Sequence, residues 1–379
     1  MKVNRMSKNE VRDRLLNIDT GFEKAGKDDG DYTIDNFSSF LYTKKEFPTN
    51  KDIKNHIKDS FNPMSINKKI EGEENKGFFS KNDLEFSNDF FDDSDFNNKF
   101  MFVGLNAAER VGKSDYSEWK NFHDIKKPTN TYRLYIQTNN DMFKGCYITD
   151  IIKSFTESDS GHVMRNFFIG DDFSFLKDKK VTSETEIKAK RIEKLAMSQF
   201  KDEASNVRKF FSGIINKAKN DGKDCISDYD SKYKFEVASV ESLNNIINEN
   251  QNILNKSMDC FIQECLAVKP DYLIVFGKDA ELILKEMSES SLFKENVGKR
   301  ITEMKRDKKP FEIDDKDINL KYVMDLISSP IEVTHYSTQS VPNSDPNEKS
   351  SRSYKFKNWF EYAPDELTTK INELEKKRN

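Results

Sequence analysis

One block of sequence, FIQECLAVKPDYLIVFGKDAELIL, constrains the fold more than any other. Apolar residues recur at three- and four-residue steps from Val240 to Cys265, which predicts an amphipathic helix, and Pro270 closes it. The apolar run Asp271–Gly277 then reads as a strand, and a second helical pattern follows it. This helix–strand–helix succession is typical of an α/β fold.

Three further segments read as strands. Lys99–Val103 is an apolar run followed by a glycine, and Gly145–Phe155 contains a strand that we expect to end at Thr149–Asp150, where a helix begins. Ser328–Ser340 contains a strand that leads into a polar loop. The alternation predicts a three-layer α/β/α fold around a mainly parallel sheet.

Polar or flexible residues follow each of these strands, namely Asn106, Asp150, Gly277 and His335. Ligands of parallel sheets bind beyond the carboxyl ends of the strands. These four positions therefore predict one site at that edge of the sheet.

The rest of the chain divides around this pattern. Residues 1–98 are charged and patchily aromatic, and they read as an N-terminal extension or elaboration. Residues 99–170 and 231–379 carry the α/β pattern, whereas residues 171–230 read as a charged helical insertion. The extension and the insertion are the segments that we expect to bind a protein partner, if there is one.

Composition limits the function classes. A net charge of -4 argues against a globally basic nucleic-acid binder but leaves room for a local basic groove. No apolar run is long enough for a membrane span or a signal peptide, and the four cysteines include no C-x-x-C pair. We expect a cytoplasmic protein without membrane contact, metal or cofactor.

In order and in neighbouring residue types, four motifs resemble those of the uracil-DNA glycosylase superfamily: VGLNAAE, YITDIIK, the block quoted above and THYSTQS. The match covers about Lys99 to Ser340. Proline is missing from the first and last turns, and the cysteines differ from those of the iron–sulfur branch. The resemblance implies a DNA glycosylase, an enzyme of base excision and DNA repair that flips a base out of the stack.

The resemblance implies two principal catalytic residues. Asn106 matches the residue that positions water, with Glu109 assisting, and His335 matches the histidine that donates a hydrogen bond to the departing base. From the residues alone, other roles are open for all three. Asn106 could cap a helix, Glu109 could be a carboxylate favoured by a helix dipole, and His335 could be an exposed loop residue. No lysine stands in the first turn, so lyase activity is not expected.

The resemblance also implies a base pocket. Gly104 and Leu105 would contact the base, and Phe122 would stack on it unless it is a core residue. Tyr336 and Ser337 would contact the DNA or wedge the stack, although an ordinary turn is the alternative.

Asp150 stands where the family carries an asparagine that reads uracil. An ionised carboxylate only accepts hydrogen bonds, so it opposes uracil O4 and suits the N4 amino group of a cytosine-type base. The alternatives are a protonated Asp150 or a helix N-cap. A modified cytosine as target would favour a role in antiviral defence against phages.

Basic residues near the motifs, among them Lys113, Lys153 and Arg352, would contact the backbone of single- or double-stranded DNA. The sequence thus predicts a hydrolase that removes a flipped pyrimidine base, uracil or a cytosine-type base. The alternatives are a non-catalytic nucleic-acid or nucleotide sensor on the same fold, and an α/β nucleotide hydrolase. The last of these lacks a G-x-x-x-x-G-K phosphate loop.

Overall fold

The structure is a computed structural model. It describes residues 7–23, 30–57, 81–93, 96–106, 118–125, 128–155, 160–167, 193–198, 205, 207–209, 212, 237–306, 320–337 and 357–378.

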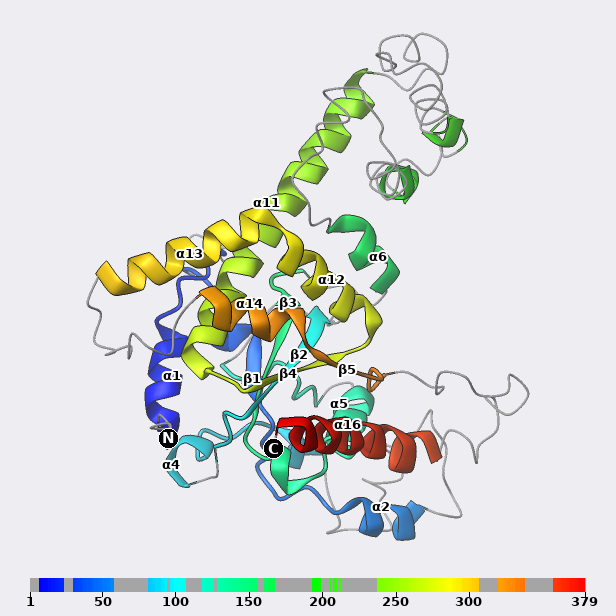
Figure 1. Cartoon of the computed structure of the whole chain (residues 1–379). Helices are drawn as coiled ribbons and strands as arrows, with labels where there is room; N and C mark the ends of the chain where they lie inside the picture. The colour runs from blue at the N-terminus through cyan, green and yellow to red at the C-terminus, as the bar shows by residue number, and fades with distance from the viewer. Residues whose placement is uncertain are drawn as a thin grey trace.

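The described part of the chain forms an α/β fold around a five-stranded, mostly parallel sheet (Figure 1). The strand order is β1-β3-β2-β4-β5, and only the edge strand β1 is antiparallel to its neighbour. The strands are β1 Ser38–Phe40, β2 Phe100–Asn106, β3 Tyr147–Ile152, β4 Tyr272–Phe276 and β5 Ile331–Val333.

Helices cover both faces of this sheet (Figure 1). One face packs against α1 Lys8–Leu16, α11 Val237–Val268, α12 Lys278–Glu289, α13 Ser291–Arg306 and α14 Leu320–Ser328. The other face packs against α5 Thr129–Gln137 and α16 Ala363–Arg378. The remaining described helices include α2 Asn50–Ile57, α4 Phe90–Asp93, α6 Ser160–Asn166 and the π-helix η7 Asn358–Tyr362.

Successive side chains along each strand point to opposite faces of the sheet, which divides the core into two parts. On β2, Met101 and Val103 point toward α11, whereas Phe100 and Phe102 point toward α5 and α16. Because strands buried on both faces are apolar throughout, the continuous apolar runs in the sequence are explained. The predicted α/β class and mainly parallel sheet are therefore confirmed.

Two predicted boundaries are wrong. The strand that begins near Lys99 continues through Gly104 to Asn106, because β3 pairs with it along that whole length. Likewise β3 continues to Ile152, and no helix begins at Asp150. Asp150 is therefore a residue within a strand and not a helix N-cap.

Residues 1–98 contribute to the same core in the parts described. β1 pairs with β3, and Phe37, Phe40 and Leu41 are buried, whereas Tyr42 is partly buried. Most of the predicted insertion, residues 171–230, lies outside the described residues. Within the described residues, no helix is both long and apolar enough to cross a bilayer.

Candidate functional site at the carboxyl edge of the sheet

The order in which the chain adds parallel strands to the sheet reverses at β2. After β2 the chain adds β3 on one side, and after β3 it returns to add β4 on the other side. Open α/β sheets bind ligands at such a switch point, beyond the carboxyl ends of the strands. Asn106 ends β2, Gly277 follows β4, and His335 lies two residues beyond β5. The topology therefore brings Asn106 and His335 to one edge, two strand spacings or about 10 Å apart.

Gly277 lets the loop of residues 334–337, called the His335 loop, approach the end of β4. Its φ of 89° lies in the left-handed region that favours glycine, and its N–H donates to Val333 O at 2.8 Å. A Cβ on Gly277 would lie 3.4 Å from His335 Cβ. A side chain here would be strained and would crowd the histidine.

The hydrogen bonds of His335 define its tautomer. The backbone N–H of Ser337 donates to Nδ1 at 3.1 Å, and Ser337 Oγ lies 2.8 Å from the same nitrogen. Because Nδ1 accepts, the neutral ring carries its proton on Nε2. Burial lowers the pKa of His335 to about 4, so the ring is neutral near pH 7. His335 therefore offers an Nε2–H donor, and that atom has no partner among the described residues.

Three hydrogen bonds hold the backbone of this loop. Gln137 Nε2 donates to Thr334 O at 2.8 Å, and Thr334 N donates to Glu366 Oε2 at 3.0 Å. Arg133 Nη1 donates to Ser337 O at 3.2 Å. The loop thus depends on α5 and α16, two helices that the motifs did not point to.

Asp150 lies with Gly104 and Phe122 on the α5 face of the sheet. Gly104 pairs with Asp150 across the two strands, and a Cβ on Gly104 would collide with Asp150 Oδ1. The same Cβ would lie 3.7 Å from Phe122 Cε1. Gly104 is therefore required by the close approach of a carboxylate and an aromatic ring.

Asn121 supports this arrangement, although no sequence pattern singles it out. Its Nδ2 donates to Asp150 Oδ2 at 3.0 Å and to Phe37 O at 2.8 Å. The next residue, Phe122, is buried and has a φ of 68°, which is rare for a bulky side chain. Strained backbone of this kind gathers at ligand sites. The core-residue alternative for Phe122 also holds, because its ring belongs to the apolar cluster on this face.

Asn106 is partly exposed at the end of β2. Its Nδ2 donates to Phe155 O at 3.2 Å, which fixes the orientation of the amide. Leu105, by contrast, is buried on the opposite face of the sheet among the residues that pack against α11. Its side chain does not line the site, so the predicted contact between Leu105 and a base is wrong for the side chain.

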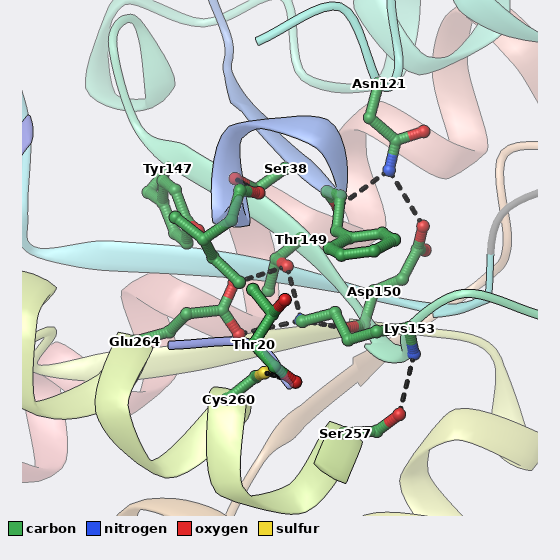
Figure 2. A network of polar contacts seen from close by, with 12 residues as sticks. Thr20, Ser38, Asn121, Tyr147, Thr149, Asp150, Lys153, Ser257, Cys260 and Glu264 are labelled. Carbon is green, nitrogen blue, oxygen red and sulfur yellow. Dashed lines mark hydrogen bonds and ion pairs between the residues drawn. The ribbon is translucent and has the colours of Figure 1, made fainter. Parts of the chain in front are cut away.

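Lys153 is the clearest correction to the predicted site. It is 1% exposed, and its Nζ lies 2.7 Å from Glu264 Oε2 on α11 and 2.8 Å from Thr149 Oγ1 (Figure 2). Tyr147 and Thr149 donate to the other Glu264 oxygen at 2.7 Å. The prediction that Lys153 contacts DNA is wrong, because its charge is enclosed and paired.

This buried network connects β3 to α11. Lys153 Nζ also donates to the backbone oxygen of Asp150 at 2.5 Å, and Lys153 N donates to Ser257 Oγ at 2.9 Å (Figure 2). The network therefore holds the backbone of the strand that presents Asp150. A lysine that follows a run of apolar residues gives no local sign of such burial, so the sequence predicts an exposed Lys153.

Tyr336 turns toward the sheet. Its ring stacks on His335 with centroids 4.3 Å apart and meets Phe276 edge-on at 5.2 Å. Ser337 contacts the histidine, as described above. The predicted Glu109, Lys113 and Arg352 lie outside the described residues.

A separate hollow lies at the opposite edge of the sheet. Leu41, Tyr135, Asn139, Phe143 and Lys144 are among its lining residues. Leu41 follows β1, which runs antiparallel to β3, so this hollow lies by the amino end of β3. It contains none of the predicted site residues.

Comparison of the chain with protein-family models, with curated proteins and with solved structures finds no match. The function is therefore inferred from the residues at the carboxyl edge of the sheet and from the motif resemblance.

Proposed function

We propose that the protein is a monofunctional DNA glycosylase, which hydrolyses the N-glycosidic bond of a flipped pyrimidine base. One observation carries the proposal: Asn106 ends β2, Asp150 lies within the neighbouring strand β3, and His335 follows β5, so all three lie toward the carboxyl ends of the parallel strands. The motif resemblance in the sequence predicts these same three residues.

The leaving base needs a hydrogen-bond donor, because negative charge develops on it as the bond breaks. Neutral His335 supplies such a donor at Nε2, since its Nδ1 accepts from Ser337. A neutral donor adds no charge to the site before the reaction. The ring also stays neutral over a wide pH range, because burial lowers the pKa of His335 to about 4.

Water must reach the sugar carbon as the base departs. The Asn106 amide, oriented by its bond to Phe155 O, holds that water by hydrogen bonds, although an amide is a poor base. Catalysis then comes from positioning and from stabilisation of the departing anion. Phe122 provides an aromatic surface beside Asp150 for the flipped base.

The base class follows from Asp150. Its Oδ2 already accepts from Asn121, and Oδ1 is directed at Gly104. An ionised carboxylate reads an amino group, so we favour a cytosine-type base, plain or modified, over uracil. A modified cytosine would connect the enzyme to defence against phages with altered DNA.

The test is release of free base from single- and double-stranded oligonucleotides that carry uracil, cytosine or a modified cytosine. We expect the Asn106→Ala variant to lose about 100-fold or more in rate while it still binds DNA. Asn372→Ala, on the exposed side of α16, is the matched control and should keep full activity. Retained DNA binding without release of any base by the wild type would refute the proposal and favour a non-catalytic sensor.

A further inference from the structure

Arg133 is a buried cation beside the His335 loop. It lies on α5 and is 7% exposed, and its guanidinium stacks on the ring of Trp359 at 4.1 Å. Nη1 donates to Asn130 Oδ1 at 3.3 Å and to Ser337 O at 3.2 Å. Nε is fully buried without a partner, and Nη2 has none among the described residues.

No carboxylate neutralises this charge in the described part of the chain. The carboxylates on the adjacent strand and helix, Glu332 and Glu366, pair instead with Lys370 at 3.4 and 2.8 Å. Burial lowers the pKa of Arg133 to about 10, so the group is still charged at pH 7. A buried charge without a counter-ion is costly, and proteins usually pair or remove it.

The same chain shows the usual solution elsewhere. Lys153 is buried even more completely, and Glu264 neutralises it at 2.7 Å. Among the described residues Arg133 has only neutral acceptors and an aromatic face, and most of its five N–H donors make no hydrogen bond to them. A guanidinium fork of this kind matches the geometry of a phosphate.

We propose that Arg133 binds a phosphate group at the edge of the loop formed by residues 334–337. The inference rests on the proposed function, in which that phosphate belongs to the DNA strand next to the flipped nucleotide. The contact to Ser337 O then lets one guanidinium hold both the phosphate and the loop that carries His335. Bound DNA would thus stabilise the position of the His335 donor.

The first experiment measures DNA affinity by fluorescence anisotropy between about 50 and 200 mM salt. Loss of one phosphate contact lowers the slope of log K against log salt by about 0.9 for duplex DNA and about 0.7 for single strands. We expect this change in Arg133→Gln and none in Lys285→Gln, a lysine exposed on α12. A merely structural role for Arg133 would weaken binding without changing the slope, and that result would overturn the inference.

The second experiment separates a nucleic-acid phosphate from free phosphate. In a Trp119→Phe background, Trp359 is the single tryptophan and reports on the guanidinium stacked against it. If inorganic phosphate changes its fluorescence, saturates, and loses the effect in Arg133→Gln, while the wild type binds no DNA, the site takes a free anion. The phosphate site would then stand although the proposed function fails.

Arg133→Lys covers the case in which Arg133→Gln does not fold. It keeps the charge, so the salt slope should stay near the wild-type value. It loses the planar fork, so affinity for DNA should fall several-fold. Two results would overturn the phosphate site and leave the proposed glycosylase intact, provided that the wild type binds DNA. One is an Arg133→Lys variant that binds DNA with the wild-type affinity. The other is a folded Arg133→Gln variant that keeps the wild-type salt slope.

Discussion

Removal of the Lys153 ammonium tests the buried network behind Asp150. In Lys153→Met the side-chain volume is nearly kept, but the Glu264 carboxylate loses its counter-ion while it stays 0% exposed. Tyr147 and Thr149 still donate to it at 2.7 Å. The pKa of Tyr147 lies well above its usual value because of burial and of Glu264, so the phenol keeps its proton and continues to donate.

The size of the loss of stability follows from the buried Glu264 carboxylate that the substitution leaves without a counter-ion. Removing one partner of a buried pair costs about 3–5 kcal/mol of unfolding free energy. Since two donors remain on Glu264, we expect a value near the lower end, about 3 kcal/mol. The partly exposed pair Lys54–Glu361, at 3.2 Å, is the matched control, and Lys54→Met should cost no more than about 1 kcal/mol.

Urea unfolding of Lys153→Met, Glu264→Met and the double variant measures these terms as a double-mutant cycle. We expect the double variant to be more stable than the sum of the single changes predicts, by about 2 kcal/mol or more. A cost for Lys153→Met no larger than that for Lys54→Met would refute the reasoning, because the charge would then not be enclosed.

Two further predictions follow from the site. NMR titration of the His335 ring, assigned by the peak that His335→Gln removes, should give a pKa near 4, with the Nε2–H tautomer above it. Because the folded-state pKa lies below the unfolded one, this residue should favour folding above about pH 6.5 and lose that effect as the pH falls toward 4; a midpoint near 6.5 would contradict the burial argument. Gly104→Ala should destabilise the protein by about 1–3 kcal/mol, because its Cβ meets Asp150 Oδ1. Gly298→Ala in α13, where a Cβ meets nothing within 4 Å, should stabilise it by up to about 1 kcal/mol, and equal effects of the two changes would contradict the proposed crowding at Gly104.

The sequence predicted the parallel strands and the long helix well, because their apolar patterns are local. The helix predicted from Val240 to Cys265 lies within α11, and the strand predicted at Asp271–Gly277 contains β4. The strand ends were less predictable. Gly104 reads as a strand end, yet pairing with β3 carries the strand past it, and Asp150 lies within β3 for the same reason.

The site was predictable only where a motif carried it. Asn106, Asp150 and His335 follow from the resemblance, but Asn121, Gln137 and Glu366 support them from distant segments with no local signal. Burial of a charged residue is likewise a tertiary property. Folding makes Lys153 a partner of Glu264 and leaves Arg133 without a carboxylate among the described residues. In the sequence, both residues look like ordinary exposed basic residues.

The most direct test of the central claim is a single-turnover measurement of base release by the wild type and by Asp150→Asn. An amide both donates and accepts, so the substitution should move preference from a cytosine-type base toward uracil, by about 1–3 kcal/mol in the difference between the two. The claim predicts that the wild type releases the cytosine-type base and that the variant reverses the order. Release of uracil by both proteins with the same preference would show that Asp150 does not read the base.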